Sequence, residues 1–190
     1  GGFVGRFGEQ RALTLDIVDY PGEWLIDLAL LHQSYDGWAA VTLARLKAEP
    51  YRSRMRPFLD GIGENDPDRL TRCYMEALER CRGDRLSLLQ PGRALTPSAF
   101  EVVPEAVLFA PVPPYHPLAP AFRQRYDDYV QRWVKPFKTH VVDAVDRQIV
   151  LVDVLESLNR GPAHFDDTRA AMAMILEAFN YGRSGYWQRI

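Results

Sequence analysis

Two short stretches of strand-like sequence lie near opposite ends of this chain. The first, R-A-L-T-L-D-I-V-D over residues 11–19, alternates apolar and polar side chains with a period of two. The second, R-Q-I-V-L-V-D over residues 147–153, has four consecutive apolar residues, which is typical of a strand buried on both faces of a parallel sheet. About 130 residues separate them, and two strands alone do not make a complete sheet. We therefore expect strands outside this sequence to complete it.

Helices and proline-rich loops are expected between these stretches. Asp66, followed by Pro67, is suited to cap a helix that runs to about residue 82. An Asp side chain accepts hydrogen bonds from the free amides of a first helical turn, and Pro has no amide to leave unpaired there. Residues 83–117 are rich in Pro and Gly, and within them only residues 106–109 are a candidate strand.

Two further helices are expected towards the end of the chain. A long one is predicted over about residues 120–145, and Pro136 is the point at which it kinks or divides. The last is predicted to run through Phe179, with Asp166 or Asp167 as its cap. The pattern as a whole favours an α/β class in which most helices belong to one insertion.

Length and composition indicate an ordinary globular protein. The 190 residues suit one domain, or one domain with a large insertion, and the chain is 47% hydrophobic and 25% charged. A net charge of −2 gives no electrostatic reason to expect nucleic acid or an anionic membrane surface as a partner. No apolar run approaches the roughly 20 residues that span a bilayer, and no signal-peptide pattern opens the chain. We expect a cytoplasmic protein.

The cysteines and the first residues add two expectations. Cys73 and Cys81 are eight positions apart in a helical stretch, which fits neither a Cys-x-x-Cys metal pair nor a disulfide framework. Both are therefore expected to be buried as small hydrophobic residues in a reducing compartment. The sequence starts at Gly1-Gly2-Phe3 without a Met, which favours a fragment of a longer protein.

Asp19 and Gly22 have the spacing of a known phosphate-binding motif. Asp19 ends the first strand-like stretch, and Tyr20-Pro21-Gly22 follows as a turn. In an open α/β sheet, ligands bind outside the carboxyl ends of the strands. Asp-x-x-Gly is the switch II motif of GTPases, in which the Asp holds Mg²⁺ and the Gly amide reaches the terminal phosphate. The same letters also describe an ordinary turn.

The other parts of a nucleotide site are missing from the sequence. A P-loop needs Gly-x-x-x-x-Gly-Lys-Ser/Thr, and no Gly-Lys pair occurs. A guanine-reading Asn/Thr-Lys-x-Asp motif is also absent. By itself, this sequence is not expected to bind a nucleotide tightly.

Three longer segments resemble one family. They are D-I-V-D-Y-P-G-E-W-L-I-D-L at residues 16–28, S-L-L-Q-P-G-R at 87–93 and R-Q-I-V-L-V-D-V-L-E-S-L-N-R-G at 147–161. Together they are similar to the YcjX-like family of bacterial P-loop NTPases, and the resemblance covers nearly the whole chain. The sequence departs from the family by lacking the P-loop and the base-reading motif, so catalysis by this chain alone is not expected.

The resemblance implies a fold and a division of the chain. The fold would be α/β, a P-loop NTPase-like parallel-sheet core that is incomplete in this chain and carries a large helical insertion. Residues 1–31 and 143–190 would belong to the nucleotide-binding core, and residues 32–142 would form the insertion. The P-loop would precede Gly1, and the base-reading motif would follow Ile190.

The resemblance also implies roles for residues around the Asp-x-x-Gly motif. Asp19 would be the carboxylate associated with Mg²⁺, and Gly22 the phosphate-sensing hinge of switch II. Glu23 follows that Gly, where many GTPases carry Gln or His to orient the attacking water, so it is a candidate catalytic residue. The alternative is a surface carboxylate at the start of a helix, which the helix dipole favours.

Arg93 is the second candidate catalytic residue. It lies in Gln90-Pro91-Gly92-Arg93, and an arginine on such a turn would be able to reach a phosphate as an arginine finger supplied by the same chain. The alternative is a solvated turn in which Arg93 pairs with a nearby carboxylate. Both interpretations stay open at the level of sequence.

Two other groups of polar residues are weaker candidates. Asp153 ends the second stretch as Asp19 ends the first, so that stretch also resembles a Walker B strand; the family order instead puts Asp153 near the site or at a cap. His140, Asp143 and Asp146 share one helix, but one His and two Asp make a poor zinc site. A solvated helix face is the expected account of these three.

The function implied is binding and hydrolysis of a nucleotide, GTP or ATP, with Mg²⁺ by a regulatory switch. The family's association with bacterial stress responses suggests regulation rather than metabolism. A regulatory protein partner is expected but is not identified by the sequence, and peripheral membrane association through such a partner stays open.

The second hypothesis is of another class. The helical insertion would be a partner-binding module on a nucleotide core that is degenerate or catalytically weak. An exposed cluster of the insertion's aromatic side chains would favour this hypothesis. These are Tyr35, Trp38, Tyr51, Phe58, Tyr126 and Trp133.

Overall fold

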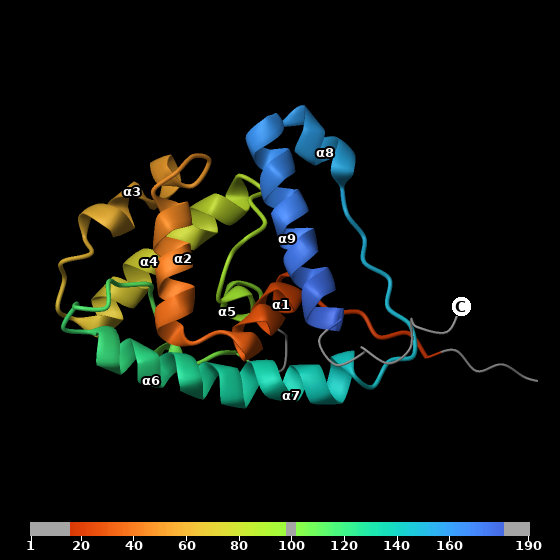
Figure 1. Ribbon diagram of the computed structural model, residues 1–190, viewed down its shortest axis with the longest axis horizontal. Helices are drawn as coiled ribbons and strands as arrows, with labels where there is room; N and C mark the ends of the chain where they lie inside the picture. Colours follow the sequence, from red (N-terminus) through yellow and green to blue (C-terminus); the bar gives the residue numbers. More distant parts are fainter. Residues whose placement is uncertain (1–15, 98–101, 181–190) are drawn as a thin grey trace, which may run out of the picture.

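Helices form all the regular structure of the described residues (Figure 1). The structure is a computed structural model that describes residues 16–97 and 102–180. The elements in order are α1 (Glu23–Ile26), the 3-10 helix η1 (Asp27–His32), α2 (Tyr35–Leu46), α3 (Arg52–Asp60), α4 (Pro67–Gly83), α5 (Gly92–Leu95), the 3-10 helix η2 (Glu105–Val107), α6 (Ala119–Tyr129), the π-helix η3 (Val130–Val134), α7 (Lys135–Phe137), the π-helix η4 (Lys138–Val142), α8 (Val154–Asn159) and α9 (Pro162–Asn180).

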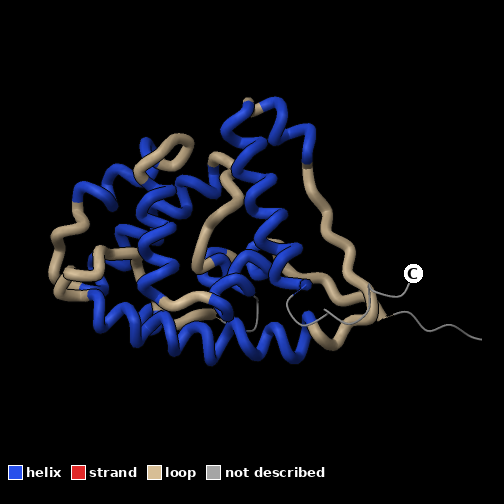
Figure 2. Tube along the Cα trace, in the orientation of Figure 1, coloured by secondary structure: helices blue, strands red, loops and turns tan. Residues whose placement is uncertain are grey.

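The expectation of a parallel-sheet α/β core is wrong for the described residues, because no strand forms among them (Figure 2). Residues 16–18 and 147–153 run as unpaired segments, and Ile17, Ile149 and Leu151 are 83%, 87% and 90% exposed. An apolar strand is stable only beside hydrogen-bonded neighbours that also cover its faces, and no such neighbour lies in the described part of the chain. Residues 11–15 of the first stretch lie outside that part.

The third strand prediction, at residues 106–109, is also wrong. The 3-10 helix η2 occupies the first part of this segment, after Pro104. Phe109 is fully buried, so the apolar character of the segment reflects burial in a helical core. A short apolar run does not by itself distinguish a strand from other buried backbone.

The predicted long helix is confirmed as a continuous path from α6 through η4, along one edge of the molecule (Figure 1). Its hydrogen bonding changes around Pro136, which lacks the amide that an α-helix requires at that position. The π-helical segments η3 and η4 lie on either side of it, and the Lys135 amide, for example, bonds to the Val130 carbonyl. The helix ends at Val142, three residues before the expected end.

The two cap predictions have different outcomes. Asp66 caps α4 as expected, since one carboxylate oxygen accepts from the amides of Asp68 and Arg69 at 2.9 and 3.2 Å. The cap expected at Asp166 or Asp167 is wrong, because α9 already begins at Pro162. Gly161 precedes that proline with a φ of 101°, a conformation that favours glycine, and this turn sets the start of the helix.

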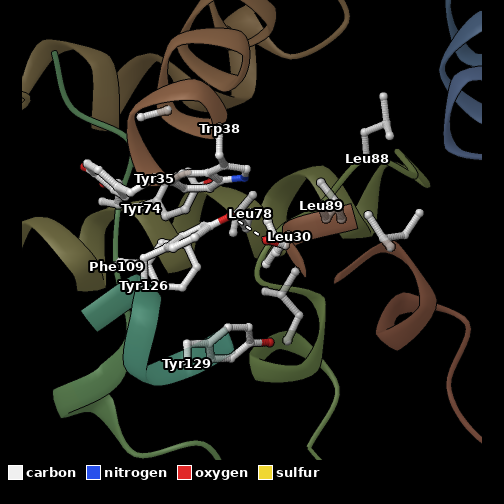
Figure 3. Packing of buried hydrophobic residues seen from close by; sticks show 14 of the residues in the cluster. Leu30, Tyr35, Trp38, Tyr74, Leu78, Leu88, Leu89, Phe109, Tyr126 and Tyr129 are labelled. Carbon is white, nitrogen blue, oxygen red and sulfur yellow. Dashed lines mark hydrogen bonds between the residues drawn. The ribbon is translucent and has the colours of Figure 1, made fainter. Parts of the chain in front are cut away.

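Aromatic side chains form the centre of the core between α2, α4 and the long helix (Figure 3). The Trp38 ring lies 4.9 Å from Phe109 and 5.8 Å from Tyr126, measured between ring centroids. Tyr126 points towards η1, where its hydroxyl donates to the Leu30 carbonyl at 3.1 Å. The core thus joins η1 directly to the helices that follow it.

The aromatic residues that would have signalled a partner-binding surface are all buried. They are Tyr35, Trp38, Tyr51, Phe58, Tyr126 and Trp133, and none is more than 8% exposed. Because they fill the core, the exposed cluster that the second hypothesis needs does not occur among these residues.

The prediction that both cysteines are buried is confirmed for one of them, and the helices were also compared with the requirements of a membrane span. Cys81 is completely buried as expected, but Cys73 is only half-buried. Among the described residues, none of the helices combines the length and the apolar character needed to cross a membrane.

Candidate functional site

The Asp-x-x-Gly segment leads directly into α1. Asp19 is exposed, and the turn after it closes when the Trp24 amide donates to the Pro21 carbonyl at 3.1 Å. Gly22 is also exposed, and nothing lies within 4 Å of the position that a Cβ would take. The carboxylate of Asp19 and the backbone of Gly22 are therefore both accessible from solvent.

Glu23 is the first residue of α1 and is half-buried. Its position in the first turn agrees with the preference of carboxylates for the positive end of a helix dipole. Its backbone packs very closely on Gly92: a Cβ on that glycine would lie 2.1 Å from the Glu23 carbonyl oxygen. Both candidate catalytic residues thus lie at the contact between α1 and α5.

Trp24 is a packing anchor for the same contact. Its indole nitrogen donates to the Thr96 carbonyl at 2.8 Å, and its ring meets Phe137 edge-on at 5.4 Å. The other neighbour of this ring is the Arg93 guanidinium, 4.3 Å from the ring centroid. An indole holds a cation over its face through the charge distribution of its π-system.

Arg93 makes contacts that neither interpretation of the sequence anticipated. Besides its contact with Trp24, its guanidinium donates to the Trp133 carbonyl at 3.2 Å and lies 5.8 Å from the centre of the Phe137 ring. Its backbone amide donates to Asp27. In this arrangement Arg93 joins α1 to the long helix.

Asp27 is the residue that the sequence reasoning missed. It is 2% exposed, and its carboxylate accepts from the Gly92 and Arg93 amides, both at 2.9 Å, and from the Tyr129 hydroxyl at 2.5 Å. Burial raises the pKa of Asp27 to about 6, although these three donors and the Arg93 charge act in the opposite direction. The signal in the sequence was an acidic residue inside the apolar run W-L-I-D-L-A-L-L.

Gln90 completes the contact between the two quoted motifs. Its side chain donates to the Ile26 carbonyl at 2.8 Å and accepts from the Trp38 indole at 3.0 Å, and it is 2% exposed. The S-L-L-Q-P-G-R segment and the D-Y-P-G-E-W-L-I-D segment therefore pack on each other through buried polar bonds. Such bonds are costly to break because each leaves an unpaired group in the core.

Among the remaining polar candidates, Asp153 and Asp143 make local structural contacts. The expectation that His140, Asp143 and Asp146 share one helix is wrong, because that helix ends at Val142. Asp153 caps α8, where its carboxylate accepts from the Glu156 amide at 2.8 Å. His140 and Asp143 are exposed, and Asp143 pairs with Lys138 at 2.7 Å. Among the described residues, no three His, Cys, Asp or Glu side chains gather as a metal-binding cluster.

Comparison with known proteins assigns the chain to a family. It belongs to the YcjX-like family, DUF463, whose model matches residues 1–190. The protein called "Ras-like GTPase YcjX" in Shewanella oneidensis is 34% identical over 211 aligned residues, which cover 100% of this chain and 44% of that protein. The protein of the same name in Escherichia coli is 33% identical over 206 residues, or 97% of this chain and 44% of that protein. The chain thus spans less than half the length of these relatives.

Proposed function

We propose that this chain contributes the switch II segment to a regulatory GTPase, and that the whole protein binds and hydrolyses GTP with Mg²⁺. The observation that carries the proposal is the accessible Asp19 and Gly22 immediately before α1. The names of the two relatives support the same activity, since both are called Ras-like GTPases. Residues 1–31 and 143–190 would belong to the nucleotide-binding part, and residues 32–142 to the helical insertion.

Each residue of the segment has a stated role in this proposal. Asp19 would hold Mg²⁺ through a water molecule, and the Gly22 amide would donate to the terminal phosphate. Glu23 would orient the attacking water from the first turn of α1. When bound, GTP and Mg²⁺ supply the phosphoryl group and the charge that neutralises it.

Arg93 would act as an arginine finger only after it leaves its present contacts. Its guanidinium lies against Trp24 and donates to the Trp133 carbonyl. A finger role therefore requires a rearrangement of the Arg93 side chain that breaks both contacts when nucleotide binds. Without one, Arg93 would affect the reaction by holding Trp24 and the preceding Glu23 in place.

The test uses the full-length protein. Calorimetric titration with GTP and ATP in the presence of Mg²⁺ measures which nucleotide binds, and we expect GTP to bind more tightly. Asp19→Asn is expected to weaken Mg²⁺-dependent binding, and Glu23→Ala to lower kcat with little change in nucleotide affinity, because alanine has no polar group to orient the attacking water. The proposal would be refuted if neither GTP nor ATP bound to the full-length protein.

Arg93→Ala and Arg93→Lys separate the two possible roles of that arginine. A finger depends on the guanidinium, so both variants would lower kcat by about 10³-fold or more without changing nucleotide affinity. A holding role depends on the cation over the Trp24 ring, which the lysine ammonium retains in part. If Arg93 has this holding role, Arg93→Lys would retain most of the wild-type kcat and Arg93→Ala would not.

A further inference from the structure

The carboxylate of Asp27 lies where three distant parts of the chain meet. Gly92 and Arg93 donate to it from α5, and Tyr129 donates to it from the last residue of α6. A buried carboxylate without such partners would be strongly unfavourable, so all three donors need to stay in place together. None of the roles proposed for Asp19, Gly22 and Glu23 uses Asp27.

The helical turn from Glu23 to Asp27 contacts α5 at both of its ends. The Glu23 carbonyl lies against Gly92, and the Asp27 carboxylate binds the amides of Gly92 and Arg93. Both contacts are made with the same short segment, Gly92–Arg93, one from the first residue of α1 and one from the residue that follows α1. A shift or rotation of α1 therefore requires α5 to move with it or these bonds to break.

The long helix contacts the same segment from another direction. The Phe137 ring meets Tyr20 at 5.3 Å and Trp24 at 5.4 Å, both edge-on, and Tyr129 donates to Asp27 at 2.5 Å. Tyr129 and Phe137 are about two turns apart in the long helix. The segment from residue 20 to residue 27 runs antiparallel to this helix, so its first residues meet Phe137 and its last residue meets Tyr129. The segment from Tyr20 to Asp27 is thus held along the helix at both ends.

The part of the long helix that makes these contacts has irregular hydrogen bonding. Tyr129 lies immediately before the π-helical segment η3, and Phe137 lies immediately before the π-helical segment η4. A π-helical turn is rare and is often found at functional sites, because it holds one more residue than an α-helical turn and its register can change locally. This helix is therefore able to respond to a displacement of α1 by a local change in pairing.

We propose that Asp27 is a positioning residue that couples the switch II segment to the long helix, so that a nucleotide-dependent movement of residues 19–24 changes the conformation of residues 129–142. This inference rests on the proposed GTPase function. Asp27 acts through Tyr129 and through the backbone of Gly92 and Arg93, and it does not contact the nucleotide.

Hydrogen–deuterium exchange of the full-length protein tests the coupling. Exchange is compared between the GDP-bound form and the form bound to a non-hydrolysable GTP analogue. In the wild-type protein we expect peptides that cover residues 129–142 to differ between the two forms. Tyr129→Phe removes the hydroxyl and keeps the ring, and it is expected to reduce this difference at least twofold while both nucleotides still bind.

Tyr51→Phe is the matched control. Tyr51 is another buried tyrosine whose hydroxyl donates to a carboxylate at 2.5 Å, that of Asp167, but its bond fastens α9 and does not involve α1. This variant is expected to lose stability and to keep the nucleotide-dependent difference at residues 129–142. Phe137→Leu provides a second test of the coupling if Tyr129→Phe does not fold, since it retains apolar bulk and loses the edge-on contacts of the long helix with Tyr20 and Trp24.

The outcomes distinguish this inference from the proposed function. If neither nucleotide binds the wild-type protein, the proposed function and the coupling are both refuted. If both bind but residues 129–142 exchange equally in the two forms, only the coupling is refuted. The coupling is also refuted if Tyr129→Phe, or Phe137→Leu in its place, retains the full difference, or if Tyr51→Phe removes it to the same extent.

Discussion

Gly92 lies so close to the backbone of Glu23 that a Cβ placed on it would come within 2.1 Å of the Glu23 carbonyl oxygen. A side chain cannot be accommodated there, because the neighbouring atoms belong to backbone and cannot rotate away. Glycine at this position is therefore a requirement of the contact between α5 and α1.

We expect Gly92→Ala to lower the free energy of unfolding by roughly 2–3 kcal/mol, as overpacking in a closely packed core does. Urea unfolding followed by circular dichroism measures the change. Gly83→Ala is the control, since nothing lies within 4 Å of a Cβ at Gly83, the last residue of α4. Alanine there is expected to be neutral or slightly stabilising. Equal effects of the two substitutions would contradict the prediction.

Asp27 is expected to make stability depend on pH. Its pKa in the folded protein, about 6, lies above the ordinary value of 3.8 for an Asp side chain, because burial disfavours the charged carboxylate. The folded state thus binds the proton more tightly than the unfolded state does. The proton on Asp27 therefore adds to the free energy of unfolding. This contribution is complete below about pH 4 and is lost as the pH rises through about 6, and it amounts to about 3 kcal/mol at most.

The measurement is the difference in unfolding free energy between the wild-type protein and Asp27→Asn from pH 4 to pH 7. Asn has no proton to lose, so its contribution to stability does not depend on pH in this range. We therefore expect the wild-type protein to lose stability relative to Asp27→Asn as the pH rises from 4 to 7. The titratable groups near Asp27 include Arg93, Tyr129, Tyr74 and Tyr126, and burial and the Asp27 charge together raise the pKa of each of the three tyrosines. Parallel profiles for the two proteins would show that Asp27 does not titrate in this range.

Asp167 is expected to be essential for the attachment of α9. Its carboxylate accepts from the Tyr51 hydroxyl at 2.5 Å and from the Ser87 amide at 2.6 Å, and it is 6% exposed. Asp167→Ala leaves both donors unpaired in the core and is expected to cost about 2–4 kcal/mol. Thermal unfolding measures this loss.

The adjacent Asp166 provides the matched control. It is exposed and pairs with Arg169 at 3.0 Å on the surface of α9. A surface ion pair of this kind contributes about 0–1 kcal/mol, so Asp166→Ala is expected to change the melting temperature little. A loss at position 166 that equals the loss at position 167 would argue against the buried network as the cause.

The two thiols are expected to differ in reactivity. Burial raises the pKa of the Cys81 thiol to about 12, and Cys81 is completely buried. Burial also raises the pKa of Cys73, but this side chain is half-buried and accessible in part. Because the thiolate is the reactive form, a disulfide reagent at pH 8 is expected to modify Cys73 in the native protein and Cys81 only after unfolding. Rapid modification of both in the native state would contradict the burial of Cys81.

The sequence by itself determined the local features of this protein. Asp66 and Pro67 specified the start of α4, because a cap depends only on residues next to it in the chain. Apolar and aromatic residues recur at helical spacing from Phe122 to Val141, and this local pattern specified the long helix. The segments at residues 16–28, 87–93 and 147–161 also identified the family, which was confirmed over the whole chain.

Only the tertiary structure decided which of the local sequence patterns formed the expected helix or strand, and which distant residues came into contact. The strand-like patterns at residues 11–19 and 147–153 did not lead to strands in the described residues, because a strand requires neighbours that a single segment does not specify. The contacts of Asp27 with Gly92, Arg93 and Tyr129 join positions 65 to 102 residues apart. No local pattern in the sequence encodes such a contact, since it depends on how the helices pack.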